Sequence, residues 1–232
     1  MPRQSTLPNL DGPKISDATV KRLSKYYRTL QNAIATEKTT ISSEEIARIN
    51  GLTAAQVRKD LSFFGAFGRR GLGYNVSDLH RNISQILGLH RTWNVCLVGA
   101  GNIGTALVHF KQFQDQGFIF RLILDSDTSK YGQKIGDLEI QDFENCEELI
   151  RREKIKIAVV AVPSHAAQRV VDRLVQAGIK AILNFAPVTI LVPPGVFVRN
   201  ENMVIEIEAL SYALTSKGGH RPRAGVPVPV PA

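Results

Sequence analysis

The sequence is poor in cysteine, methionine and tryptophan. Its 232 residues include two Cys, two Met and one Trp. Cys96 lies in an apolar run and Cys146 precedes a helical segment, so neither has the spacing of a metal ligand set. We expect both thiols to pack in a reducing cytosol and expect no metal site.

Long apolar runs are also absent. No stretch has the length of a membrane span, and the N-terminus, MPRQSTLPNLDGPK, lacks the apolar centre of a signal peptide. These absences predict a cytoplasmic protein with no membrane partner.

Acidic residues are scarce in the first part of the chain. Residues 1–92 carry fourteen Lys and Arg against seven Asp and Glu, whereas residues 93–216 carry twelve against fourteen. A basic surface attracts polyanions, so the first part suggests a nucleic-acid partner. Residues 217–232 are rich in Gly, Pro and Val without periodicity and are expected to be a disordered tail.

The basic part has the pattern of a helix-turn-helix. Residues with capping side chains indicate three helix starts, at Ser16 or Asp17, at Ser42 with Glu45 three residues later, and at Thr53. The second helix ends at Gly51 and the third is expected over 54–64. Two short helices joined by a tight glycine turn are typical of DNA-binding domains.

The third helix and the segment after it carry the candidate DNA contacts. The outward face of the helix holds two cations, Arg58 and Lys59, which suit phosphates and guanine edges. The segment 65–76, GAFGRRGLGYNV, is interpreted as a glycine-rich hairpin, the wing of a winged helix. The assigned residues are Ser43, Ala55, Arg58, Lys59, Ser62, Arg69, Arg70, Gly71 and Tyr74. A further helix is expected over 78–89, and the domain 1–90 ends there.

The second domain, 91–216, opens with a dinucleotide-binding pattern. The segment VGAGNIG follows an apolar strand and begins a helix. Gly99 permits the tight turn, Gly101 allows close approach of a pyrophosphate, and Gly104 allows the helix to pack on the strand. Asp125 ends the next apolar run at the place of a ribose-binding acid, which favours NAD(H) over NADP(H), although Lys130 lies nearby.

Later segments complete an α/β sheet. The runs 155–162 and 181–184 are expected to be buried strands, and the turns after them lie where ligands bind in such sheets. Pro163 and Ser164 are expected to stop the first run and cap a helix, and His165 is interpreted as solvated or capping. The segment 203–214 fits either a strand or a helix with an apolar seam, which must pack on its own domain or on another subunit.

Two other functions fit parts of this pattern. An NAD-dependent dehydrogenase would need an acid or base beside a bound substrate, and the sequence shows no such pair. A CoA-binding module shares the Rossmann pattern, but the acid at Asp125 favours a ribose diol.

Several segments together closely resemble the Rex family of redox-sensing transcriptional repressors. They are YYRTL, TAAQVRKDLSFFGAFGRRGLGYNV, VGAGNIG, AVPSHAAQ, AGIKAILNFAPV and EALSYAL, and the resemblance spans residues 15–214. It implies a homodimer that binds a palindromic operator through two winged helices and binds NADH or NAD⁺ through two Rossmann domains. It also implies that NADH releases the DNA and that the last helix is exchanged between subunits.

The resemblance also implies residue roles. The cofactor residues are Gly99, Ala100, Gly101, Asn102, Ile103, Gly104, Asp125, Lys130, Val162, Pro163, Phe185, Ala186 and Pro187. Arg28 matches an arginine that pairs with an Asp at the exchanged helix, and Met203 matches a residue that reaches the nicotinamide. Here Asn202 stands at that Asp, and Phe110 replaces a Tyr that can bond it. With acid and hydroxyl both replaced, the size of the response to NADH stays open.

Overall fold

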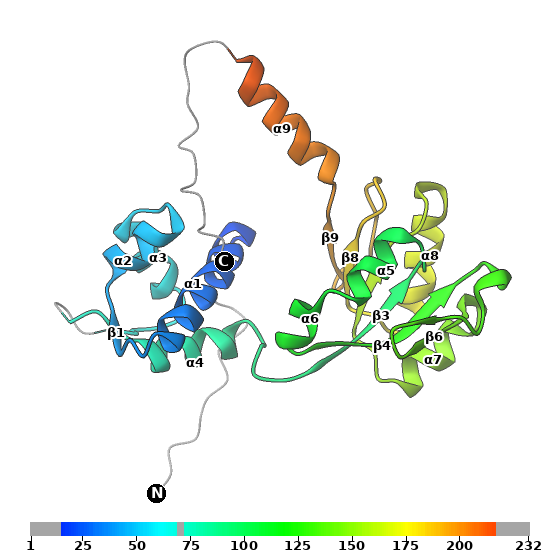
Figure 1. The fold of residues 1–232 in the computed structure, drawn as a ribbon, viewed down its shortest axis with the longest axis horizontal. Helices are drawn as coiled ribbons and strands as arrows, with labels where there is room; N and C mark the ends of the chain where they lie inside the picture. Colours follow the sequence, from blue (N-terminus) through cyan, green and yellow to red (C-terminus); the bar gives the residue numbers. More distant parts are fainter. Residues whose placement is uncertain (1–14, 69–71, 217–232) are drawn as a thin grey trace, which may run out of the picture. The chain divides into compact units, whose positions relative to one another are not determined.

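The computed structural model describes residues 15–68 and 72–216 (Figure 1). The chain divides into two compact units between His90 and Arg91, and each unit is described by itself. The predicted disordered tail, 217–232, lies outside the described residues.

In its described residues, the N-terminal unit has four helices and a two-stranded sheet, which are drawn in Figure 1. Its elements are α1 (Asp17–Ala35), β1 (Thr40–Ile41), α2 (Ser43–Asn50), α3 (Ala54–Ser62), β2 (Tyr74–Asn75) and α4 (Val76–Ile86). Ser16, Ser42 and Thr53 cap the first three helices, because each side chain accepts a hydrogen bond from the backbone N–H three residues later. These starts confirm the capping pattern.

Two helix boundaries differ from the prediction. The third helix ends at Ser62 rather than Phe64. The fourth begins at Val76 rather than at 78, because the Asn75 side chain caps it by accepting from the Asp78 N–H at 2.9 Å. It ends at Ile86 rather than at 89, where Gly88 takes a positive φ of 71°.

The predicted hairpin within 65–76 includes residues 69–71, which lie outside the described residues, so it stays a prediction. Tyr74 pairs with Ile41, and Asn75 with Thr40, in an antiparallel ladder that joins β2 to the strand before α2. Gly73 permits this approach, since a Cβ there would lie 2.6 Å from the Ile41 carbonyl oxygen. Residues 65–68 form no strand.

The C-terminal unit is a doubly wound sheet of seven strands in the order β5-β6-β4-β3-β7-β8-β9 (Figure 1). Its strands are β3 (Trp93–Val98), β4 (Phe118–Asp125), β5 (Lys134–Ile135), β6 (Leu138–Asp142), β7 (Ile157–Val160), β8 (Ala181–Asn184) and β9 (Phe197–Asn200). All neighbours are parallel except β5 and β6. The order reverses at β3, which is the switch point where ligands bind in such sheets.

Helices cover both faces of this sheet. They are α5 (Asn102–Val108), α6 (Lys111–Asp115), α7 (Cys146–Arg152) and α8 (Ser164–Gln176), with single 3-10 turns at η1 (Thr128–Lys130) and η2 (Phe143–Asn145). Successive side chains of β3 point to opposite faces of the sheet and belong to two different hydrophobic cores. Cys96 packs with α7 and α8 on one face, and Leu97 packs with α5 on the other. The helix α8 begins at the predicted place, with Pro163 at the N-cap and Ser164 as its first residue, but no side chain caps it with a hydrogen bond.

The cysteines lie in the first of these cores. Cys96 and Cys146 are both free and fully buried. Burial raises the pKa of each thiol to about 12, which keeps both protonated and unreactive. Their predicted role in packing is confirmed.

The last element is a helix, α9 (Met203–Thr215), so the segment that fitted either a strand or a helix is a helix. None of its residues is buried within the chain. No helix in the described ranges is both long and apolar enough to span a membrane. In those same ranges, no three His, Cys, Asp or Glu side chains gather as metal ligands would.

Candidate functional site

Three glycines lie in the turn between β3 and α5 and in the start of α5, and they differ in the space around each Cα. Gly99 has φ of 100°, and a Cβ there would lie 2.5 Å from the Ala161 carbonyl oxygen, at the end of β7. A Cβ on Gly104 would lie 2.1 Å from the Gly99 carbonyl oxygen. By contrast, a Cβ on Gly101 would meet no described atom within 4 Å. The protein itself therefore requires the first and third glycines, whereas the second faces open space.

Asp125 ties this turn to the end of β4. Its carboxylate accepts hydrogen bonds from the N–H groups of Ala100 at 2.8 Å and Asp127 at 2.9 Å, and from Lys130 Nζ at 3.0 Å. Burial alone would raise the pKa of Asp125, but these three donors outweigh it and hold the pKa below its usual value. Asp125 is therefore an anion in the wall of the turn, partly neutralised by Lys130.

A cleft of about 670 Å³ lies at the switch point. Its lining residues are Val98, Gly99, Gly101, Asn102, Ile103, Asp125, Ser126, Lys130, Phe143, Ala161, Val162, Pro163, His165, Ala166 and Val170. Eight predicted cofactor residues are among them. Ala100, in the turn, and Gly104, in α5, do not line the cleft. Sequence reasoning missed Phe143, which follows the short strand β6, and dismissed His165.

The predicted loop 185–187 does not line this cleft. It follows β8, the strand beyond β7, and a fully buried side chain, Asn184, holds it. Asn184 Nδ2 donates to the Ala186 carbonyl at 3.0 Å and to Asn200 Oδ1 at 2.9 Å, and its Oδ1 accepts from the Ala186 N–H. Ala186 is buried and Pro187 is exposed. Contact between this loop and a cofactor stays a prediction.

In the N-terminal unit, α3 presents the predicted outward face. Its exposed residues are Ala55, Arg58, Lys59 and Ser62, while Val57 and Leu61 are buried. Arg58 is held in place, because its Nη1 donates to Ser43 Oγ at 2.9 Å and to Glu44 Oε1 at 3.2 Å.

A second cleft, of about 530 Å³, borders α3. It is lined by Ser43, Glu44, Arg58, Ser62 and Tyr74, among others. The structure therefore gathers four predicted DNA-binding residues, which are Ser43, Arg58, Ser62 and Tyr74. Arg69, Arg70 and Gly71 lie outside the described residues.

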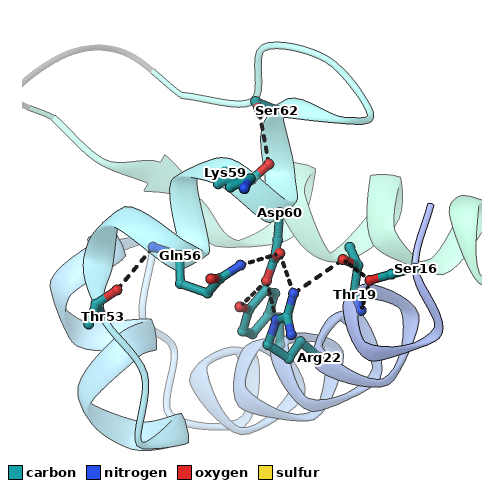
Figure 2. A network of polar contacts seen from close by, with 9 residues as sticks. Ser16, Thr19, Arg22, Thr53, Gln56, Lys59, Asp60 and Ser62 are labelled. Carbon is teal, nitrogen blue, oxygen red and sulfur yellow. Dashed lines mark hydrogen bonds and ion pairs between the residues drawn. The ribbon is translucent and has the colours of Figure 1, made fainter. Parts of the chain in front are cut away.

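Sequence reasoning missed one polar residue on the opposite face of α3. There Asp60 is fully buried and joins Arg22 and Tyr26 of α1 in a polar network (Figure 2). The helical pattern marks position 60 as inward, but only the fold supplies its partners.

The predicted switch residues divide between the units. Arg28 is exposed on α1 in the N-terminal unit. In the C-terminal unit, Phe110 is half exposed with its ring edge on Phe113, and Asn202 caps α9 by accepting from the Val204 N–H at 3.0 Å. Met203 is 60% exposed. Their role as a switch stays a prediction.

The two units define a class of protein: a basic winged-helix domain joined to a Rossmann domain whose open glycine turn suits a nucleotide. Two family models agree with this division. One described as "CoA binding domain" matches residues 90–188, and one described as "Putative DNA-binding protein N-terminus" matches residues 14–62.

Curated relatives give the family. The chain is 47% identical over 199 residues to the redox-sensing transcriptional repressor Rex of Desulfitobacterium hafniense, covering 86% of this chain and 95% of the relative. It is also 47% identical over 204 residues to the Rex of Pelotomaculum thermopropionicum, covering 88% and 96%. The chain belongs to the Rex family of redox-sensing transcriptional repressors.

Solved structures match the same fold. The Rex-family repressor RSP was crystallised with β-NAD⁺ and operator DNA; that structure is 40% identical, has a TM-score of 0.84, and the match covers 87% of this chain and 93% of RSP. RSP with β-NADH matches at 39% identity and a TM-score of 0.79, covering 87% and 95%.

Proposed function

We propose that this protein is a transcriptional repressor that senses the balance of NADH and NAD⁺ and that NADH releases it from its operator. The observation that carries the proposal is the pairing, in one chain, of the exposed cationic face of α3 with the open glycine turn beside Asp125. The 40% identical repressor RSP, crystallised with both β-NAD⁺ and operator DNA, supports the same combination of ligands.

The cleft fits a dinucleotide chemically. Backbone N–H groups at the start of α5 have no side-chain cap and would face the pyrophosphate beside Gly101. Asp125 would accept from ribose hydroxyls, and its charge disfavours a 2′-phosphate. Val162 and Pro163 offer an apolar wall, against which a neutral dihydronicotinamide is buried at lower cost than a cationic ring. We therefore expect NADH to bind more tightly than NAD⁺.

The cleft supports binding rather than catalysis. Its titratable side chains are Asp125, Lys130 and His165, and the first two pair with each other at 3.0 Å. His165 makes no hydrogen bond to an acid or base among the described residues, and we infer that the cleft lacks the proton relay of a dehydrogenase. A repressor acts on the chromosome, so we place the protein in the cytoplasm and infer no enzymatic role.

We further infer a homodimer in which α9 packs on the partner subunit. Its apolar side chains Met203, Val204, Ile205, Ile207, Leu210, Tyr212 and Leu214 are 57–87% exposed in the single chain. Leaving such a surface in water is unfavourable, and a second copy can cover it. A dimer would also place two α3 helices on the two halves of a palindromic operator.

The proposal is tested by DNA titration at fixed salt. A duplex selected from a random library would be titrated with protein alone and with saturating NADH, NAD⁺ or CoA, measuring anisotropy and stoichiometry. We expect two chains per duplex and an operator affinity that falls about 5- to 150-fold with NADH, the usual range of allosteric coupling. CoA, which the matching family model makes the second candidate ligand, is expected to have no effect.

A variant without cofactor binding supplies the control. Gly101→Val places a side chain in the open space of the turn, so it should bind the operator normally and ignore NADH. Equal operator affinity of the wild type with and without bound NADH would mean that the protein holds the cofactor without sensing it. NADH consumption with 2-keto acids would contradict the non-enzymatic role.

A further inference from the structure

Asp60 is an ionised side chain inside the helix that is proposed to read DNA. It is fully buried, and Arg22 of α1 meets it with two hydrogen bonds, from Nε to Oδ2 at 2.6 Å and from Nη2 to Oδ1 at 2.7 Å (Figure 2). The hydroxyl of Tyr26, in α1, donates a hydrogen bond to Oδ2 at 2.8 Å, and Nε2 of Gln56, in α3, donates one to Oδ1 at 2.8 Å. Both carboxylate oxygens are therefore fully engaged.

The network continues to the start of α1. Arg22 Nη2 also donates to Thr19 Oγ1 at 3.1 Å, and that hydroxyl lies 3.0 Å from Ser16 Oγ, the cap of the helix (Figure 2). The N-terminal turns of α1 are thus connected to the last turn of α3. Burial alone would raise the pKa of Asp60, but the bonds from Arg22, Tyr26 and Gln56 outweigh it and lower the pKa, so the carboxylate stays charged.

The value of such a pair lies in geometry more than in stability. A buried ion pair gains little over well-packed apolar side chains of the same size. The planar guanidinium fork, however, accepts a carboxylate in one orientation. Asp60 lies two residues after Arg58 and two before Ser62, roughly opposite both around the helix. Holding Asp60 therefore sets the rotation of α3 about its axis.

A small rotation would disturb DNA reading. At the roughly 5–6 Å radius of a helix with its side chains, a turn of about 20° moves a side-chain tip by about 2 Å. Hydrogen bonds to base edges tolerate a few tenths of an ångström. We propose that Arg22 and Asp60 are positioning residues for operator recognition: they touch no DNA, but they aim Arg58 and Ser62 at it. The inference rests on the proposed function.

Two variants distinguish a role of Arg22 and Asp60 in orienting α3 from a role in the stability of the domain. Arg22→Lys keeps the charge and loses the fork, at a side chain that is 21% exposed. Arg22→Met combined with Asp60→Leu and Tyr26→Phe replaces the ion pair and the buried hydroxyl bonded to it by apolar groups, so the domain should stay folded. Arg81→Lys is the matched control, because Arg81 bonds Asp78 at 2.8 Å in an exposed pair on α4, away from this network.

The test compares affinity for the selected operator with affinity for a scrambled duplex at one salt concentration, using concentrations corrected for active protein. Both Arg22 variants are expected to lose about tenfold in operator affinity while the scrambled duplex binds within twofold of wild type. Arg81→Lys is expected to match the wild type on both duplexes. Thermal melting of each variant is measured in parallel.

Two outcomes would overturn the inference. If both Arg22 variants keep the wild-type ratio of operator to scrambled affinity, the pair does not aim α3. If both affinities fall together in proportion to lost stability, its role is structural only. A wild-type protein that fails to distinguish the two duplexes would instead refute the proposed function.

Discussion

Replacing Gly101 or Gly104 by alanine is expected to affect different properties of the protein. In Gly104→Ala the new methyl group would lie 2.1 Å from the Gly99 carbonyl oxygen and 3.0 Å from Leu97 Cδ2, both inside the protein. In Gly101→Ala it would meet no described atom within 4 Å, and the backbone there, at φ −92° and ψ −170°, suits alanine. The first change therefore strains the fold, whereas the second places a methyl group only where a ligand would come.

The magnitudes follow from these distances. Ordinary contact begins at 3.4 Å, so the backbone around Gly104 must shift by about 1 Å. Overpacking of this kind costs typically about 1–3 kcal/mol, and we place this case at the upper end because the obstacle is backbone. At about 2–4 °C per kcal/mol, the Rossmann unit of Gly104→Ala should melt roughly 6–12 °C lower. Gly101→Ala should stay within about 0.5 kcal/mol of wild type.

The assays are calorimetry and a fluorescence titration with NADH. We expect Gly101→Ala to melt like the wild type, to bind NADH at least about tenfold more weakly because the methyl group obstructs the pyrophosphate, and to bind DNA normally. A Gly104→Ala protein as stable as wild type would refute the packing argument. A Gly101→Ala protein with unchanged NADH affinity would show that the pyrophosphate does not lie beside this residue.

Two further predictions concern the N-terminal unit. Replacing Arg58 or Lys59 by Ala should weaken operator binding by about 1–3 kcal/mol without unfolding the domain, since both side chains point outward; unchanged mobility-shift titrations for both variants would exclude α3 as the reading helix. His80 stacks on Tyr27 at 4.5 Å, its Nε2 has no hydrogen-bond partner among the described residues, and burial lowers its pKa below 6.5. The folded state favours the neutral ring of His80. The contribution of His80 to the free energy of unfolding is therefore complete above about pH 6.5 and is lost as pH falls through the lowered pKa. The free energy of unfolding of His80→Phe, measured in urea, should accordingly fall less between pH 7 and pH 5 than that of the wild type. Equal losses in the two proteins would contradict this prediction.

Local features of both domains could be predicted from the sequence because their partners lie within one turn of the chain. Ser42 and Thr53 bond an N–H three residues away, so a capping residue before an apolar pattern is sufficient to locate a helix start. The outward direction of Arg58 follows from helical periodicity alone. The glycine turn was equally local, since strand, turn and helix are consecutive.

Contacts between distant segments were not accessible in this way. The pairing of Tyr74 with Ile41 was not predicted, because the two residues lie far apart in the sequence. In α1, the apolar side chains of Val20 and Ile34 are 38% and 41% exposed, whereas Tyr26 is buried and bonds Asp60. A strand or a helix face accepts many partners of the right polarity, so the choice is made only when the whole domain packs.

The same division holds for the functional residues. The sequence by itself determined which residues are candidates for binding: the three glycines, the acid at 125 and the cations of α3, because backbone freedom, charge and periodicity are properties of the residues. Only the tertiary structure decided how they are held. Lys130 and the Ala100 N–H fasten Asp125, Ser43 and Glu44 hold Arg58, and Arg22, 38 residues away from Asp60, anchors the far side of α3. Such contacts form between groups whose chemistry is common and whose proximity is set by packing of the complete chain.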